Sequence, residues 1–347
     1  MQDRGNAAGR ARRCRRTAVR GVLLAGAVVT AAAGTAAAAP HRSARLTPVT
    51  LTIAVVPPKM IFMGFYVAKQ KGFFAKNGLD VTLMAEQGGV QAARAVAAGD
   101  AYFEAGGTDA IAASAAQNGG LEAVWSYGQN DLSLIADKSI HSVAQLKGKK
   151  VGLGDPTGPA YELTSFALRK DGLPISAVDN VILNSRAALV GALADNEIQA
   201  SAFHIDDGYT VLEKDPNVRV LEPLYKVAPL YWYGAVGVPG TYARQNPGTV
   251  VAFLKSMIEA QRWMYAHRAQ TIALSVKDTE ESPTVVAKSY DFLTANKLWS
   301  TTAGMTAAQV NWTMRQYKLN GIINRIPPNS QVFDLRYVDE ALAQLKS

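Results

Sequence analysis

The sequence predicts an α/β fold made of two similar units. Short apolar runs alternate with helical segments, which is the order typical of parallel βαβ units. The same order restarts near residue 150, and three positions match at an offset of 97 residues. Of the 347 residues, 48% are hydrophobic and 18% are charged, which is typical of a folded protein and not of a disordered one.

The first unit begins with a strand. In residues 51–56, Leu51, Ile53 and Val55 occupy alternate positions, and Pro57-Pro58 ends the run. A helix is expected over 64–71, closed by Gly72. The further expected elements are the strands 79–83, 101–105, 121–127 and 133–136 and the helices 90–98 and 110–117.

The second unit repeats this order. The expected strands are 150–153, 178–183 and 199–203, and the expected helices are 160–170 and 186–194. From about Val250 onward the chain reads as almost wholly helical, with breaks near Asp278, Ser300 and Gly321.

Three pairs of residues suggest that one plan was used twice. At an offset of 97, Gly99 matches Asn196, Asp100 matches Glu197, and Asp109 matches Asp206. Gly and Asn both tolerate the left-handed conformation that ends a helix. Each copy therefore predicts a helix, a tight turn, a short strand and an acidic residue near the start of another helix.

Residues 1–39 are expected to be a signal peptide. A basic stretch ends at Arg20, an apolar run covers 22–33, and small residues precede Pro40. The run is shorter than the ~20 residues that a membrane span needs. The pairs Arg12-Arg13 and Arg15-Arg16 resemble a twin-arginine signal, with an ordinary Sec signal as the alternative. The protein is therefore expected in the periplasm or on the extracellular face of the membrane.

The same segment explains the net charge. The formal charge of the whole chain is +8, but residues 1–39 hold seven arginines and one acid, which leaves 29 basic and 27 acidic residues. Nucleic-acid binding is therefore not expected. The only cysteine, Cys14, precedes the apolar run, so neither a lipid anchor, a disulfide nor thiol catalysis is expected. The four histidines are widely spaced, and no metal or cofactor is predicted.

Several motifs together resemble a known family. Residues 64–74 read GFYVAKQKGFF and are followed by GLDV at 78–81; AGD at 98–100 and GGTD at 106–109 come next. LKGKKVG at 146–152 and VAFLK at 251–255 complete the series. Their order and spacing resemble the nitrate/sulfonate/taurine substrate-binding proteins of ABC transporters, and the thiamine-pyrimidine-precursor binding proteins share the first signature. The resemblance covers about 50–345.

The resemblance implies a type II periplasmic-binding-protein fold. Two α/β lobes, joined by two crossing segments, would hold a ligand in the cleft between them, with a helical C-terminal part. The crossings are expected near 136–138 and 225–230. Lobe 1 would be 49–137 plus 229–347, and lobe 2 would be 138–228. The implied partners are a small-molecule ligand and the membrane permease of an ABC importer, and the protein is expected to be a monomer without catalytic residues.

Candidate ligand residues follow from the strand ends. In parallel α/β sheets, ligands bind beyond the carboxyl ends of strands, at loops that lead into helix N-termini. Four loops satisfy this rule: 57–62, 107–109, 155–159 and 203–206. Together with nearby aromatic residues they supply the predicted ligand-binding set: Lys59, Phe62, Tyr66, Thr108, Asp109, Thr157, His204, Asp206 and Trp232.

Each candidate has a structural alternative. The threonines and aspartates could cap their own helices or form salt bridges, Lys59 could be a solvated surface lysine, and His204 and Trp232 could be packed core residues. A catalytic triad of Ser201, His204 and Asp206 is not expected, because the three lie too close in sequence and no Gly-x-Ser-x-Gly motif occurs.

The predicted ligand is a small nitrogen- or sulfur-containing organic solute. The resemblance suggests nitrate, taurine or an alkanesulfonate. Acidic residues near the cleft favour a ligand with an amine or a ring N–H, so a pyrimidine-type thiamine precursor or another heterocycle is the alternative. A third hypothesis is an enzyme of pyrimidine synthesis, which the missing cysteine-rich motif disfavours.

Overall fold

The computed structural model describes residues 45–154, 158–183 and 185–346. The predicted signal peptide, residues 1–39, and the predicted ligand residue Thr157 lie outside the described residues. Across these three stretches, no helix combines the length and the apolar character that crossing a membrane requires.

The first of two sheets has five strands: β1 (Thr47–Ile53), β2 (Leu79–Ala85), β3 (Phe103–Gly106), β4 (Leu121–Ser126) and β10 (Ala235–Pro239). Their order across the sheet is β2-β1-β3-β10-β4. β1 runs parallel to β2 and β3, whereas β10 is antiparallel to β3 and β4. Val49, Leu51 and Ile53 of β1 are all buried, but Thr52 is buried as well, and the strand ends at Ile53, before Val55 of the predicted run.

The second sheet repeats this arrangement with β5 (Ser133–Asp137), β6 (Lys150–Gly152), β7 (Asp179–Val181), β8 (Ala200–Phe203) and β9 (Val218–Glu222). The order is β7-β6-β8-β5-β9, with β6 parallel to β7 and β8 and with β5 antiparallel to β8 and β9. The two sheets therefore share one pattern of strand order and direction. We call the residues around each of them the first and the second sheet unit.

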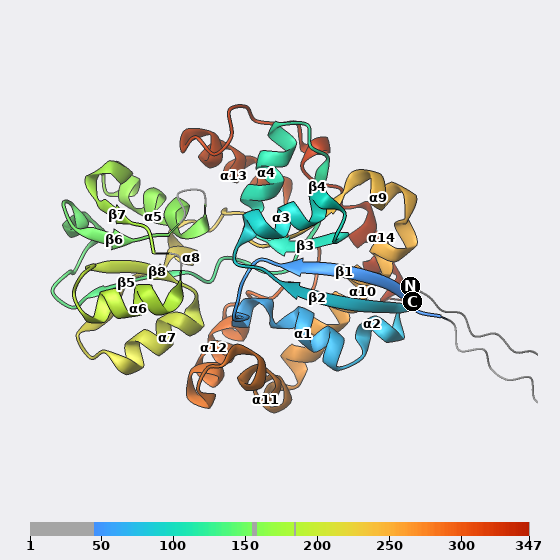
Figure 1. Ribbon diagram of the computed structural model, residues 1–347, viewed down its shortest axis with the longest axis horizontal. Helices are drawn as coiled ribbons and strands as arrows, with labels where there is room; N and C mark the ends of the chain where they lie inside the picture. Colours follow the sequence, from blue (N-terminus) through green and yellow to red (C-terminus); the bar gives the residue numbers. More distant parts are fainter. Residues whose placement is uncertain (1–44, 155–157, 184, 347) are drawn as a thin grey trace, which may run out of the picture. The chain divides into compact units, whose positions relative to one another are not determined.

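Helices cover the sheets, as Figure 1 shows. With the first sheet lie η1 (Met60–Phe62), α1 (Met63–Gln70), α2 (Phe73–Lys76), α3 (Gly89–Ala98), α4 (Thr108–Ala116) and α9 (Gly240–Gln245). With the second lie α5 (Pro159–Lys170), α6 (Arg186–Ala194), α7 (Ile205–Lys214) and α8 (Leu224–Val227). The C-terminal helices are α10 (Pro247–Ala266), α11 (Arg268–Thr279), α12 (Pro283–Ala295), α13 (Ala307–Leu319) and α14 (Arg336–Gln344), which confirms the predicted helical C-terminal part.

The turns that the sequence matched at an offset of 97 have the same geometry. Gly99 ends α3 with φ of 83°, and Asn196 follows α6 with φ of 56°. In both turns this residue donates its N–H to the carbonyl three residues earlier, at 3.1 Å. The next residue donates to the carbonyl five residues earlier, at 2.9 and 2.8 Å. Each turn leads into the strand that is third in the spatial order of its sheet, β3 in the first and β8 in the second, which confirms the predicted common plan.

The chain passes between the sheets earlier than the sequence predicted. Because β5 pairs with β8 and β9, it belongs to the second sheet, so the first crossing segment is 127–132 and not 136–138. Periodicity indicates a strand but not the neighbour with which that strand pairs, which explains the error. The second crossing segment, 223–234, includes the predicted 225–230. The two segments touch where the N–H of Leu224 donates to the carbonyl of Leu132 at 3.1 Å.

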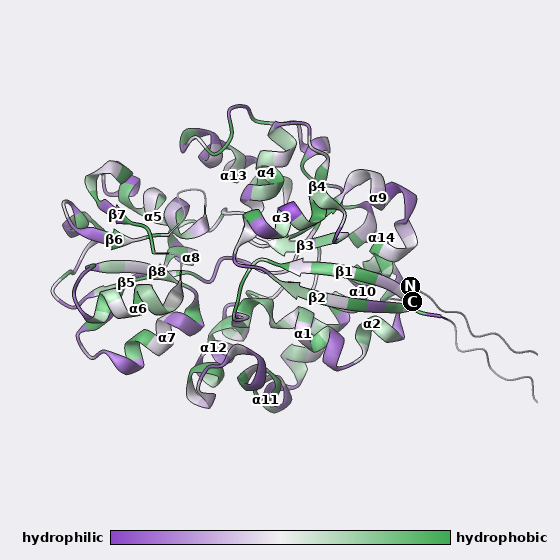
Figure 2. Cartoon of the chain, viewed as in Figure 1, coloured by the Kyte–Doolittle hydropathy of each residue, from purple (hydrophilic) through white to green (hydrophobic). Residues whose placement is uncertain are grey.

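Aromatic stacking fastens the long helix α10 to the first sheet. The ring of Phe253 stacks on Phe103 of β3, with centroids 4.3 Å apart, and on Phe74 of α2 at 5.3 Å. Apolar residues concentrate on the strands and on the helix faces that meet them, while polar residues face outward (Figure 2). Burying these large side chains supplies the main free energy of folding.

Candidate functional site

One group of predicted residues meets where η1 approaches the N-terminus of α7. The Nζ of Lys59 lies 2.7 Å from Oδ1 of Asp207, and the N–H of Met60 donates to Oδ2 of Asp206 at 3.0 Å. Lys59, Asp206 and Asp207 are all at most 4% exposed. Since η1 belongs to the first sheet unit and α7 to the second, these bonds hold the two units together.

The first crossing segment contributes to the same group. Oδ1 of Asp131 lies 2.9 Å from Nδ1 of His204. The ring of Phe62 packs at 6.4 Å from His204 and at 5.0 Å from Tyr127, which also belongs to the first crossing segment. We call Lys59, Phe62, Asp131, His204, Asp206 and Asp207 the junction cluster.

Burial and the crowding of charges shift the pKa values in the junction cluster. Burial and the neighbouring Asp207 raise the pKa of Asp206 to about 6, although Lys59 and His204 act in the opposite direction. Burial alone would lower the pKa of His204, but the charge and hydrogen bond of Asp131, with the charges of Asp206 and Asp207, raise it above the ordinary value. The junction cluster therefore contains three carboxyls and two basic groups, and both basic groups are already paired with a carboxyl.

A second group joins α4, α13 and the second crossing segment. The hydroxyl of Thr108 lies 2.8 Å from the carbonyl oxygen of Trp232 and 2.8 Å from the hydroxyl of Tyr317. The N–H of Trp232 donates to Oγ1 of Thr313 at 2.7 Å. Thr108 and Trp232 are both 1% exposed, and within the described residues the Nε1 of Trp232 has no hydrogen-bond partner.

Glu104 and Asp109 form the acidic wall of the first sheet unit. Glu104 is 1% exposed, and among the described residues neither of its carboxyl oxygens has a hydrogen-bond partner. Burial, with a smaller contribution from Asp109, raises the pKa of Glu104 to about 8. The carboxyl of Glu104 lies near the end of β3. If Gly106, the last residue of β3, carried a Cβ, that atom would be only 2.8 Å from Oε1 of Glu104. That same Cβ position is 3.1 Å from Ala54, just after β1.

A cavity of about 450 Å³ opens near this wall: Ala54 lines it, whereas Glu104 and Asp109 do not. Ala54, Lys59 and Gly88 line it from the first sheet unit, and Ser185 and Ala187 line it from the second. It therefore lies in the cleft between the two units, beyond the carboxyl end of β1, where parallel α/β sheets bind their ligands. We call it the interunit cleft.

The interunit cleft also lies at helix N-termini, because Gly88 and Ser185, which line it, precede α3 and α6. A Cβ at Gly107, which precedes α4, would be 4.0 Å from the ring of Pro159 at the start of α5. Asp109 is in turn close to the start of α3, because one of its oxygens would be 4.0 Å from a Cβ at Gly89. The first turns of helices carry unpaired N–H groups, which suit oxygen atoms of a ligand.

The predicted residue Tyr66 lies apart from the others. It is partly buried on α1, and burial together with Asp278 of α11 raises its pKa to about 12. Among the contacts of the described residues, none joins Tyr66 to the junction cluster or to Thr108 and Trp232.

Two carboxyls in this region escaped the sequence prediction. Glu104 is the one charged residue of β3, whose four residues are all buried, and a lone charge inside an apolar run was the signal available. Asp131 gave no such signal, because its importance depends on the place where the chain crosses. Among the described residues, no group of three or more His, Cys, Asp or Glu side chains could hold a metal ion.

Solved structures define the class of fold. The periplasmic aliphatic sulphonate-binding protein SsuA from Escherichia coli aligns with a TM-score of 0.70 at 18% identity, covering 82% of this chain and 91% of that one. The desulfurization enzyme DSZB aligns with a TM-score of 0.65 at 15% identity, covering 86% and 99%. The chain has the periplasmic-binding-protein fold, with two α/β lobes and a helical C-terminal part. Binding proteins and an enzyme share this fold, so the fold alone does not decide the activity.

The family is narrower than the fold. The chain belongs to the NMT1/THI5-like family, whose model matches residues 59–271. A protein of Brucella abortus (strain 2308), described as a binding protein, is 26% identical over 212 residues, which are 61% of this chain and 66% of that protein. YtlA of Bacillus subtilis (strain 168), also described as a binding protein, is 26% identical over 257 residues, 69% of this chain and 74% of YtlA. The chain thus spans just under two thirds of the length of the Brucella relative.

Proposed function

We propose that the chain is the exported solute-binding component of an ABC importer. It would enclose one small nitrogen-containing organic solute between its two lobes and then present it to the membrane permease. Membership of the NMT1/THI5-like family supports this function, as do relatives described as binding proteins. The lobes would be the two sheet units, and the two crossing segments would act as the hinge. Against an enzyme, the only cysteine is Cys14, within the predicted signal peptide.

One observation carries the choice of solute. Buried polar groups in native proteins are almost always hydrogen-bonded, so a buried group without a partner needs an explanation. Both carboxyl oxygens of Glu104 lack a partner among the described residues, and Ala54 beside them lines the interunit cleft. A solute that donates N–H groups to Glu104 would satisfy these oxygens. The unpaired indole N–H of Trp232 would offer a donor to an acceptor atom of the same solute.

The charges of the cleft favour a solute with an amine, amidine or ring N–H over a bare anion. Lys59 and His204, the basic groups of the junction cluster, are already paired with Asp207 and Asp131. A simple anion such as nitrate has no N–H to donate to Glu104 and would lie near a second acidic residue, Asp109. An aminosulfonate such as taurine and an aminopyrimidine both carry the donors that the acidic wall needs.

A thermal-shift screen of the mature chain, residues 40–347, tests this proposal. Taurine, aminopyrimidines, unsubstituted alkanesulfonates and nitrate would be compared at equal ionic strength. A solute that binds only the folded protein raises the melting temperature. We expect one or more of the N–H-bearing solutes to do so, and nitrate to have no effect. A screen in which only nitrate or the plain alkanesulfonates raise the melting temperature would contradict the choice of solute.

Two variants connect the binding to the cleft. Glu104→Gln should weaken the affinity about 10- to 100-fold, because a hydrogen bond to a charged group contributes roughly 1.5–3 kcal/mol. Trp232→Phe keeps an aromatic ring and should cost about 3- to 10-fold. Glu122→Gln is the matched control, since Glu122 pairs with the exposed Arg244 and does not line the interunit cleft. Equal affinities in all three variants would show that the solute binds elsewhere.

A further inference from the structure

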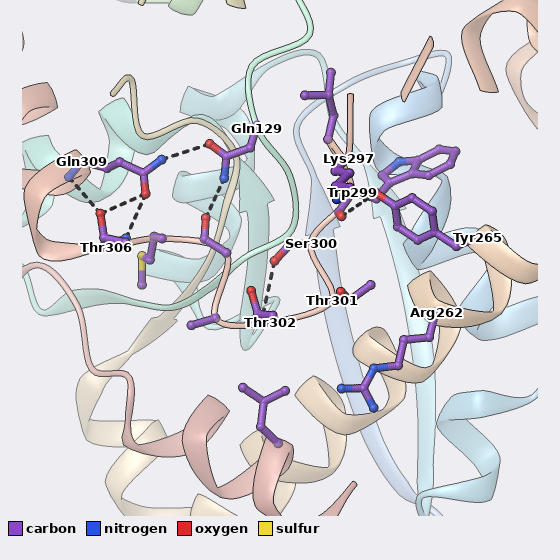
Figure 3. A pocket seen from close by; sticks show the side chains of 15 residues that line it. Gln129, Arg262, Tyr265, Lys297, Trp299, Ser300, Thr301, Thr302, Thr306 and Gln309 are labelled. Carbon is purple, nitrogen blue, oxygen red and sulfur yellow. Dashed lines mark hydrogen bonds between the residues drawn. The ribbon is translucent and has the colours of Figure 1, made fainter. Parts of the chain in front are cut away.

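A second and larger pocket lies on the first sheet unit, outside the interunit cleft. It has a volume of about 810 Å³, within the range that small-molecule sites occupy. Its walls come from α10, from the loop 297–306 between α12 and α13, and from Gln129 of the first crossing segment. Figure 3 shows Arg262 on one side and the hydrogen-bonded amides of Gln129 and Gln309 on the other, with Ser300, Thr301 and Thr302 between them. We call it the loop pocket.

The charge of the loop pocket has one sign. Of the described residues that line it, only Arg262 and Lys297 are charged. Neither forms an ion pair or a hydrogen bond with another described side chain, although this structure pairs lysine or arginine with a carboxylate at several other places. The remaining polar lining is made of hydroxyl and amide groups, which can donate hydrogen bonds. A fork of guanidinium N–H groups and an ammonium together suit an oxyanion.

The loop that forms the pocket wall is fixed to the first crossing segment. The N–H of Gln129 donates to the carbonyl of Leu298 at 2.8 Å, and the N–H of Ser300 donates to that of Tyr127 at 3.1 Å. The indole N–H of Trp299 donates to the carbonyl of Met60 at 3.2 Å. Met60 is the residue whose own N–H reaches Asp206 in the second sheet unit. The pocket wall is therefore two hydrogen bonds away from the junction cluster.

A backbone constraint keeps the wall in place. Gly304 has φ of +74°, and a Cβ on it would overlap the carbonyl oxygen of Ser126. The side-chain amide of Gln129 donates to the carbonyl of Gly304 at 2.8 Å. The capping box at Thr306 and Gln309 fixes the start of α13 just after it. The loop pocket is therefore a formed cavity with an ordered rim.

We propose that the loop pocket is a second ligand site, which binds a small organic anion carrying a carboxylate or phosphate group. The anion would lie in the pocket that Arg262 and Lys297 line and would accept hydrogen bonds from the hydroxyls of Thr301 and Thr302. This site is separate from the interunit cleft and has the opposite charge preference. The acidic residues Glu104 and Asp109 lie near the interunit cleft, whereas Arg262 and Lys297 line the loop pocket.

Indole NMR of the mature chain tests this site directly. The sequence has five tryptophans, and the Nε1–H signal of Trp299 can be assigned from a Trp299→Phe spectrum. Citrate and glycerol 3-phosphate would be titrated at constant ionic strength, with glycerol as the neutral comparator. We expect at least one of the two anions to shift the Trp299 signal saturably and glycerol to leave it unchanged. Absence of saturable binding by both anions would overturn the proposal.

Charge reversal identifies the residues that carry the binding. Arg262→Glu with Lys297→Glu should reduce the anion affinity at least about tenfold. Lys277→Glu with Lys318→Glu makes the same change in net charge at exposed positions outside the pocket and should retain the affinity. An equal loss in both double variants would overturn the proposal, because it would indicate a nonspecific effect of charge. Glu104→Gln should leave this binding unchanged, and a change in affinity there would place the anion in the interunit cleft instead.

Discussion

Two buried carboxyls in this protein show how partners decide the state of an ionisable group. Asp206 is fully buried and accepts hydrogen bonds from the backbone N–H groups of Met60 and Asp207. Its pKa is raised only to about 6, because Lys59 and His204 partly offset the burial. Glu104 has no donor among the described residues, and its pKa is raised to about 8. At neutral pH, the fold therefore keeps Glu104 largely protonated until a donor arrives.

The raised pKa of Glu104 predicts a dependence of stability on pH. The folded state holds this proton up to about pH 8, whereas the unfolded chain releases it near the ordinary value of 4.5. Between these pH values the folded protein binds more protons, so its stability falls as the pH rises. In the Glu104→Gln variant this loss of stability does not occur. Above pH 8 its free energy of unfolding should therefore exceed that of the natural protein by at most about 5 kcal/mol. Urea melts at pH 4.5, 6.5 and 8.5 measure the difference.

Glu122→Gln serves again as the comparison for this titration, because Glu122 has an arginine partner on the surface. It should be no more stable than the natural protein at any of the three pH values. If Glu104→Gln gave the same free energy of unfolding as the natural protein at pH 8.5, the carboxyl of Glu104 would have to be solvated or paired, and the solute model would lose its main support.

The helix-to-strand turns are the elements that the sequence described best. Gly99 and Asn196 were matched from spacing alone, and both adopt positive φ values in turns with the same hydrogen bonds. The left-handed conformation costs most residues that carry a Cβ roughly 1–2 kcal/mol, whereas Gly, and to a lesser degree Asn and Asp, adopt it readily. The residue types at these two positions are therefore informative. By contrast, β5 was expected in the first unit but pairs within the second sheet, since its apolar pattern would fit either one.

The matched turns predict matched energetics. Gly99→Ala should destabilise the protein by about 1–2 kcal/mol through backbone conformation alone, because a Cβ there would contact nothing within 4 Å. Asn196→Ala should cost about 1 kcal/mol for the same reason, and Asn196→Gly should be close to neutral. Denaturant unfolding of the three variants measures these differences. A larger loss for Asn196→Gly than for Asn196→Ala would mean that the side chain of Asn196, and not its φ angle, stabilises the turn.

At the scale of the whole molecule, the sequence predicted the two units but not how they meet. Strand and helix periodicity and the spacing of 97 residues were enough to predict the two units, because these patterns depend on the local order of residues. The contacts between the units depend on which loops face one another, and no pattern in one loop reports on its partner. Lys59 was predicted as a ligand residue from its place in a loop, yet it pairs with Asp207 of the other unit. Thr108 likewise bonds to Trp232 and Tyr317.

Further contacts join the two units near α7 and near α5. Near α7, the hydroxyl of Thr210 donates to Glu281 at 2.6 Å. Near α5, Arg169 donates to Asn320 at 2.7 Å and to Gln316 at 2.9 Å. Most of these bonds are partly exposed and contribute little each. The pair of Lys59 and Asp207 differs, since both side chains are at most 6% exposed.

Closure of the lobes should therefore depend on Lys59. Lys59→Met leaves Asp207 and Asp206 buried together without that cation, which is strongly unfavourable in the closed arrangement, by roughly 3–5 kcal/mol. We expect the variant to have a larger radius of gyration than the natural protein at pH 7.5 by small-angle X-ray scattering. Protonation near the raised pKa of Asp206, about 6, removes the repulsion, so the difference should shrink at pH 5. Lys288→Met removes the exposed pair with Glu213, which also joins α12 to α7, and should leave the radius unchanged. If the two variants scattered alike, burial of the charge would not be what couples Lys59 to closure.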